Sequence, residues 1–115
     1  MTNAESSQST DIDEIVTRIV EVAQPEQVIL FGSSARGTAS RHSDLDFLVI
    51  KAGRYNSRTV AGAIYLRMRG IVTAIDLVIV TPKQVEEYRN SPFSVVYPAL
   101  RDGIVVYERK KPVAG

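Results

Sequence analysis

Apolar positions near the start of the chain have the spacing of a helix. Residues 1–10 are rich in Ser, Thr, Gln and Asn, which predicts a flexible N-terminal tail. From Asp11 the pattern changes, and Asp11 with Glu14 predicts the capped start of a helix that ends before Pro25. One face of this helix carries the apolar residues Ile12, Ile15, Val16, Ile19 and Val20. We expect this face to cover a sheet.

Short apolar runs predict the strands of that sheet at residues 28–31, 47–50, 73–80 and 104–107. Helical spacing predicts helices from residue 57 or 59 to 69, from 81 to 89 and from 93 to 101, and a short helix is expected within 33–43. Apolar residues on both faces of the second and third strands predict a sheet covered on both sides. The expected fold is therefore α+β: one domain over residues 11–108, with a mixed sheet of about four strands flanked by helices, then a polar tail at 109–115.

Length and composition limit the function classes. The 115 residues suffice for one domain with a modest core, and no apolar run is long enough to cross a membrane. The N-terminus is polar and acidic, unlike a signal peptide, and the chain has no cysteine. Both features fit a cytoplasmic protein. A net charge of +1 argues against broad, nonspecific binding of nucleic acid.

Three aspartates lie in or beside apolar runs, where a carboxylate is unfavourable. Asp44 and Asp46 are two positions apart, so their side chains share one face of the second strand. Asp76 interrupts the third run and joins the other two if the strands are neighbours; the alternative is a structural aspartate at the start of a strand. A divalent cation stabilises such a group of carboxylates, and oxygen ligands suit magnesium or manganese.

The first strand ends in Gly32 and Ser33, which have the properties of a phosphate site. Glycine lets a phosphate approach the backbone, and serine offers a hydroxyl and an amide. Arg36 either contacts a triphosphate or fixes the loop by pairing with a carboxylate. Arg41 offers a contact to a nucleotide or a protein, whereas His42 is expected to be a solvated loop residue. A metal site beside a phosphate site indicates nucleotide chemistry.

Gly32-Ser33 followed by Asp44-Leu45-Asp46 resembles the signature of the polymerase-beta-type nucleotidyltransferase superfamily. The surrounding sequence is most similar to its shortest branch, the minimal nucleotidyltransferases, over residues 11–108. This resemblance implies a polymerase-beta-like domain that transfers a nucleoside monophosphate, AMP from ATP, to a hydroxyl group. It implies that Asp44, Asp46 and Asp76 are catalytic and hold one or two Mg²⁺ ions, with Mn²⁺ as the alternative ion. The nucleotide phosphates would be bound by Gly32, Ser33 and Arg36.

The branch that the chain resembles includes antitoxins encoded beside HEPN-domain toxins. The resemblance therefore implies a HEPN ribonuclease toxin as partner, neutralised by adenylylation of a tyrosine or by complex formation. The chain has no length for a further domain, so the second wall of the cleft is expected from this partner or from another copy of the chain. Two alternatives stay open: a binding-only antitoxin or interaction module, and a transferase for a small hydroxylated molecule. No membrane partner and no direct nucleic-acid partner are expected.

Overall fold

The fold combines four helices and four strands over the part of the chain that the structure describes. This structure is a computed structural model, which describes residues 4–32 and 44–109. In chain order the elements are α1 (Ala4–Ala23), β1 (Gln27–Phe31), β2 (Leu45–Ile50), α2 (Ser57–Leu66), β3 (Ile75–Val80), α3 (Pro82–Tyr88), α4 (Val96–Asp102) and β4 (Ile104–Glu108). Among the described residues, no helix has the length and apolar character needed to cross a membrane.

The four strands form one mixed sheet in the order β3-β2-β1-β4. β1 runs antiparallel to both β2 and β4, whereas β2 and β3 are parallel and are connected through α2. A parallel pair requires such a crossover, because the chain must return to the same end of the sheet. The α+β class and the four-stranded mixed sheet predicted from the sequence are confirmed.

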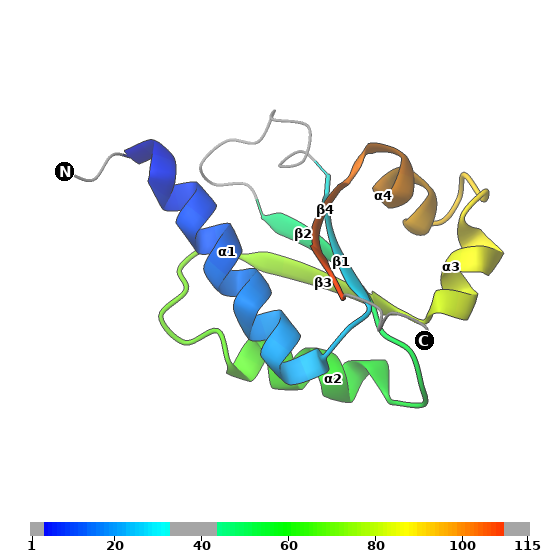
Figure 1. Ribbon diagram of the computed structural model, residues 1–115, viewed down its shortest axis with the longest axis horizontal. Coiled ribbons are helices and arrows are strands. Elements are labelled where there is room, and N and C mark those ends of the chain that lie inside the picture. Colours follow the sequence, from blue (N-terminus) through cyan, green and yellow to red (C-terminus); the bar gives the residue numbers. More distant parts are fainter. Residues whose placement is uncertain (1–3, 33–43, 110–115) are drawn as a thin grey trace, which may run out of the picture.

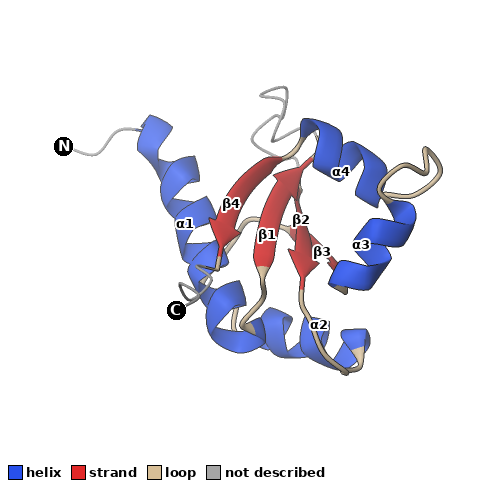
Figure 2. Ribbon diagram, turned by 45° about the vertical axis from the view of Figure 1, so that its right-hand side comes forward, coloured by secondary structure: helices blue, strands red, loops and turns tan. Residues whose placement is uncertain are grey.

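Helices cover both faces of the sheet, as the apolar pattern of the strands predicts. α1 and α2 lie on one face, and α3 and α4 lie on the other (Figures 1 and 2). Beneath α1 and α2, the core includes Ile15, Ile19, Val28, Leu30, Phe47 and Ile64. Beneath α3 and α4, a second core cluster contains Ile29, Leu48, Ile50, Val80, Val96 and Ala99. Successive residues of β2 alternate between these clusters, so this interior strand is anchored from both sides.

The start of α1 corrects one prediction. The expected flexible tail at residues 1–10 is helical from Ala4, and residues 1–3 lie outside the described part of the chain. Asp11 is consequently an interior residue of the helix rather than its cap. Its carboxylate instead accepts a hydrogen bond from the Thr73 hydroxyl at 3.2 Å. A polar composition indicates that a segment avoids the core, but it does not prevent helical hydrogen bonding when no Pro or Gly interrupts the segment.

Other boundaries differ by a few residues. α2 ends at Leu66 rather than at residue 69, and Arg18 of α1 donates hydrogen bonds to the carbonyl groups of Arg67 and Arg69 at 2.9 and 2.8 Å. These hydrogen bonds hold the segment that follows α2 against α1, in place of the predicted continuation of the helix to residue 69. The predicted start of α3 is confirmed, because the Thr81 side chain accepts a bond from the Gln84 N–H as an N-cap. The short helix expected within residues 33–43 lies outside the described residues.

The end of the domain lies slightly beyond the predicted boundary. Arg109, expected to begin a polar tail, donates its backbone N–H to the carbonyl of Glu26 at 2.9 Å. Its guanidinium also pairs with the Glu26 carboxylate at 3.2 Å. Arg109 therefore belongs to the folded unit, whereas residues 110–115 lie outside the described part of the chain.

Candidate active site

One end of the sheet brings together chain segments that are distant in sequence. β1 ends there, and both β2 and β3 begin there, because β1 is antiparallel and β3 parallel to β2. The register pairs Asp46 with Asp76 across β2 and β3, and pairs Phe31 with Asp46 across β1 and β2. Residues in register on neighbouring strands point to the same face, so the carboxyl groups of Asp46 and Asp76 lie side by side.

These carboxyl groups lie on the face that carries α3 and α4. Leu48 and Ile50 alternate with the other residues of β2 and pack in the second core cluster, so Asp46 points to that same face. Asp46 is half-buried and Asp76 is exposed. Asp44, directly before β2, is exposed as well. The pair is thus held by the sheet but open to solvent, as an active site requires.

Gly32 approaches the same carboxyl group from β1. Its φ of +81° lies in the left-handed region, which favours glycine. A Cβ atom at this position would clash with Oδ2 of Asp46. The prediction from the sequence assigned this glycine to the close approach of a phosphate. The structure adds a second reason for glycine, because the backbone at the end of β1 lies against the Asp46 carboxyl group.

The electrostatics of Asp46 differ from those of an ordinary surface aspartate. Partial burial raises the pKa of Asp46, and the negative charges of Asp76 and Asp44 raise it further. A hydrogen bond between the carboxyl groups of Asp46 and Asp76 acts in the same direction. Without a cation, the ionised forms of these groups repel one another. The repulsion between these carboxylates therefore destabilises the metal-free site, and a bound cation would offset this repulsion.

This raised pKa gives a pH dependence of stability for the metal-free chain. The folded state binds the Asp46 proton more tightly than the unfolded state, so its stability falls as pH rises from about 4 through the raised pKa. Urea unfolding in the presence of a chelator, at a series of pH values, measures this slope. We expect the Asp46→Asn variant to lose this part of the pH dependence. At pH values above the raised pKa, it should unfold at a higher urea concentration than the parent chain. Equal pH slopes for the two chains would contradict the assignment.

The donor set fits a hard divalent cation. Magnesium commonly takes one or two carboxylates and completes its coordination with substrate phosphates and water. Asp46 and Asp76 supply two carboxylates side by side. Asp44 is close enough for its negative charge to raise the pKa of Asp46. Within residues 4–32 and 44–109, no group of three or more His, Cys, Asp or Glu side chains converges closely enough to hold one ion. The chemistry of the pair fits magnesium, and the participation of Asp44 as a third ligand stays a prediction.

The structure does not place every predicted site residue. It brings together Gly32, Asp46 and Asp76, and it positions Asp44 beside them. Ser33, Arg36, Arg41 and His42 lie outside the described residues.

Gly103 supports the site in a way that the sequence did not indicate. The sequence suggests only a turn there, but a Cβ atom would clash with the Ala99 carbonyl and would lie 2.6 Å from Cγ2 of Ile29 and 3.0 Å from the Leu30 carbonyl oxygen. The glycine lets α4 pass closely over the end of β1. This contact holds the strand that leads into Gly32.

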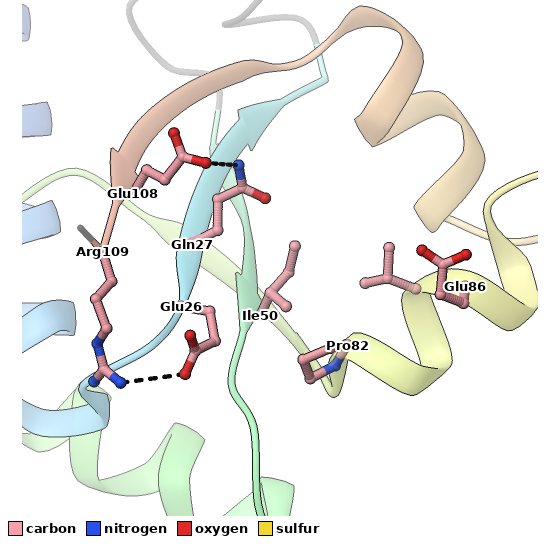
Figure 3. A pocket seen from close by; sticks show the side chains of 8 residues that line it. Glu26, Gln27, Ile50, Pro82, Glu86, Glu108 and Arg109 are labelled. Atoms are coloured by element: carbon pink, nitrogen blue, oxygen red, sulfur yellow. Dashed lines mark hydrogen bonds and ion pairs between the residues drawn. The ribbon is translucent and has the colours of Figure 1, made fainter. Parts of the chain in front are cut away.

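A cavity of about 290 Å³ lies at the opposite end of the sheet from the carboxyl pair. It is lined by residues at the start of β1, the ends of β2 and β4, and α3, including Glu26, Ile50, Pro82 and Glu108 (Figure 3). The ion pair between Arg109 and Glu26 closes one side. None of the predicted site residues that the structure describes (Gly32, Asp44, Asp46 and Asp76) lines it, so this cavity is separate from the carboxyl pair.

Fold and sequence together identify the class of protein. The family described as polymerase beta, nucleotidyltransferase matches residues 11–112, which is most of the chain. The chain therefore belongs to the polymerase beta nucleotidyltransferase family. No match was found among curated proteins.

Solved structures share the fold at low sequence identity. A candidate nucleotidyltransferase from Sulfolobus solfataricus is 23% identical with a TM-score of 0.58, over 95% of this chain and 93% of that protein. A toxin–antitoxin complex with AMP-PNP contains a chain that is 19% identical with a TM-score of 0.59, over 85% of this chain and 74% of its own length. A mutant of the toxin–antitoxin complex MntA-HpeT gives 17% identity and a TM-score of 0.57, with the same coverage. At these identities the similarity establishes the fold.

Proposed function

We propose that this protein is a magnesium-dependent nucleotidyltransferase that transfers a nucleoside monophosphate, AMP from ATP, to a hydroxyl group of a protein partner. The observation that carries the proposal is the register of Asp46 with Asp76 beside Gly32. The two carboxylates lie side by side at the end of a strand and repel each other, so they favour a bound cation. The glycine next to them leaves the backbone accessible to a phosphate. The family membership of the chain supports the same reaction class.

We assign the site residues the following roles. Asp44, Asp46 and Asp76 would hold the cation, and Asp76, the exposed member of the register pair, would accept the proton of the attacking hydroxyl. When bound, Mg²⁺ neutralises charge on the triphosphate and on the departing pyrophosphate. Gly32 allows the phosphates to approach the backbone, and Ser33 and Arg36, which follow it in the chain, are the proposed further phosphate contacts.

The reaction exchanges one phosphorus–oxygen bond for another. The acceptor oxygen forms a bond with the α-phosphorus, and the bond between that phosphorus and the oxygen bridging to the β-phosphate breaks. Pyrophosphate leaves, and the hydroxyl proton passes to the carboxylate of Asp76 and then to water. The catalytic effect of the chain lies in positioning and charge stabilisation, because no covalent intermediate with the protein is needed.

We further propose that the partner is a toxin and that this chain is its antitoxin, with a HEPN-type ribonuclease as the expected toxin. Two structures of similar fold are of toxin–antitoxin complexes, one of which contains AMP-PNP. The exposure of Asp44 and Asp76 is consistent with a cleft whose other wall comes from a second protein. A binding-only antitoxin is the second candidate. The pairing of Asp46 with Asp76 favours the enzyme, since a surface used only for binding has no need for adjacent carboxylates that repel each other.

Calorimetric titration of nucleoside triphosphates into the purified chain tests the proposal directly. We expect ATP to bind in the presence of Mg²⁺ and binding to become undetectable in a chelator, because the phosphates and the carboxylates repel without the cation. Asp44→Asn removes one carboxylate at an exposed position and is expected to weaken this binding by about tenfold or more.

A matched control uses a carboxylate away from the site. Asp13→Asn changes an exposed residue of α1 by the same chemistry and is expected to bind ATP like the parent chain. Binding that is independent of magnesium, or equal in the Asp44→Asn and parent chains, would contradict the proposed site. Loss of toxin neutralisation in Asp44→Asn with an intact complex would support chemistry over simple binding.

A further inference from the structure

β3 is an edge strand, and its backbone orientation is fixed by hydrogen bonds at both ends. The Leu45 N–H donates to the Ala74 carbonyl at 3.0 Å, and the Lys51 N–H donates to the Val80 carbonyl at 2.8 Å. The N–H and C=O of one residue point to the same side of a strand, and this side alternates along the chain. Even-numbered residues of β3 therefore face β2. The odd-numbered residues direct their backbone groups outward, where the described part of the chain provides no further strand. The outward carbonyl of Ile75 accepts a hydrogen bond from the Tyr65 hydroxyl of α2 at 3.4 Å, so the edge available to another chain lies at Leu77 and Ile79.

The outward residues also line a groove on the α2 face of the sheet. Leu77 and Ile79 form its floor, and Ser57, Arg58 and Ala61 of α2 form its wall. The groove has a volume of about 180 Å³. An apolar cavity of about 150 Å³ accommodates a benzene molecule, so this groove is of a size for an apolar side chain rather than for a nucleotide. Outward backbone groups at Leu77 and Ile79, beside a groove with an apolar floor, are the two features that an added strand requires.

The two edges of the sheet are not equivalent. β4 pairs with β1 through an irregular register between Val28 and Ile29, and it ends in Glu108 followed by Arg109. Bulges and charged residues of this kind protect an edge from pairing with another chain. β3 spans Ile75–Val80 with a regular register, and Asp76 is its sole charged residue. Among the described residues, the edge that carries Asp76 is therefore the less protected one, with Tyr65 of α2 bonded only to its first residue, Ile75.

We propose that the acceptor binds as an extended segment that adds to the outer edge of β3 as a further strand. This inference rests on the proposed transferase function. A residue opposite Asp76 would point to the catalytic face with its Cβ about 5 Å from that of Asp76. Its neighbours in sequence would point to the other face, where the groove at Leu77 and Ile79 accepts an apolar side chain. The acceptor is thus a hydroxyl residue flanked by apolar residues in an extended, locally unfolded segment.

Arg58 adds a preference for charge. It lies at the rim of the groove with its side chain exposed, and within the described residues no carboxylate is close enough to form an ion pair with it. An acidic residue in the bound segment would pair with this guanidinium. The surface thus favours an acceptor segment that pairs as a strand and carries both an apolar side chain and a negative charge. Its hydroxyl group would lie beside Asp76.

Hydrogen exchange measured by NMR tests the strand addition without requiring catalysis. The probe is a short synthetic peptide with a central tyrosine, a valine on each side of it and an aspartate near one end. We expect the amides of Leu77 and Ile79 to exchange freely in the isolated chain and to become protected when the peptide binds. The amides of Asp76 and Val78 face β2 and should be protected in both states. Peptides N-methylated at one position at a time should lose affinity at alternate positions, because only every second amide faces β3.

Two variants of α2 test the groove. Ala61→Arg fills the groove and is expected to weaken peptide binding by at least about tenfold, a change of one decade in Kd. Thr59→Arg places the same side chain at an exposed position of the same helix outside the groove, and it should bind like the parent chain. If Ala61→Arg fails to fold, Arg58→Glu gives an independent test. It should weaken binding of the peptide with aspartate and be rescued by a peptide with lysine at that position.

The outcomes separate this inference from the proposed function. If ATP and magnesium bind as expected while the peptide leaves the Leu77 and Ile79 amides unprotected, the strand addition is wrong and the transferase function stands. If the peptide protects these amides but ATP does not bind, the function is wrong and the inference about an acceptor falls with it. Protection that appears with rising concentration of the chain alone would assign the edge to a second copy, which also overturns the proposal.

Discussion

Replacing Asp46 or Asp76 by asparagine is expected to reduce nucleotide transfer by at least about 100-fold. Each change removes one of two carboxyl groups that the register places side by side, and asparagine neither holds a divalent cation as well nor accepts the proton of the acceptor. The measurement is the rate of AMP transfer to the partner protein, or to the bound peptide, from labelled ATP at saturating magnesium.

Stability measurements separate this loss from unfolding. The carboxyl groups of Asp44, Asp46 and Asp76 repel one another in the metal-free chain, so Asp46→Asn should be as stable as the parent chain or more stable at neutral pH. Asp102→Asn serves as the matched control, because it changes an aspartate at the end of α4 that pairs only with the neighbouring Arg101 among the described residues. Retention of transfer by the Asp46→Asn variant would refute the assigned site.

Gly32→Ala is expected to damage both stability and function. The left-handed backbone at Gly32 costs a residue with a Cβ atom about 1–2 kcal/mol, and the added carbon would clash with the Asp46 carboxyl group. Relief of that clash requires Asp46 or the end of β1 to shift. A displacement of about 1 Å near the reacting atoms can reduce the rate by about 100-fold. Urea unfolding and the rate of AMP transfer give the two readouts.

Gly62 provides the matched control for this substitution. It lies inside α2, is exposed, and has no neighbouring atom within 4 Å of an added Cβ. Gly62→Ala should therefore stabilise the chain by about 0.5–1 kcal/mol and leave transfer unchanged. If Gly32→Ala behaved like Gly62→Ala, the close approach of β1 to Asp46 would have no functional role.

Local pattern was sufficient for most of the fold. The apolar runs of β1, β2, β3 and β4 and the capped start of α3 depend on spacing and on side chains close in sequence, so each was predicted to within a few residues. Helical boundaries that depend on distant contacts were less accurate. α2 ends where Arg18 of α1 bonds to the carbonyl groups that follow it, and α1 extends through a polar segment that composition alone suggested was flexible.

The parts of the site that are close in the chain could be predicted without the fold: the glycine at the end of β1, and the two aspartates, two positions apart, where β2 begins. The register of Asp76 with Asp46, the approach of Gly32 to the same carboxyl group, and the position of β3 at an edge of the sheet became visible in the folded chain alone. Spacing along a strand fixes the face of a side chain, whereas register and strand order follow from burial of both apolar faces of the whole sheet.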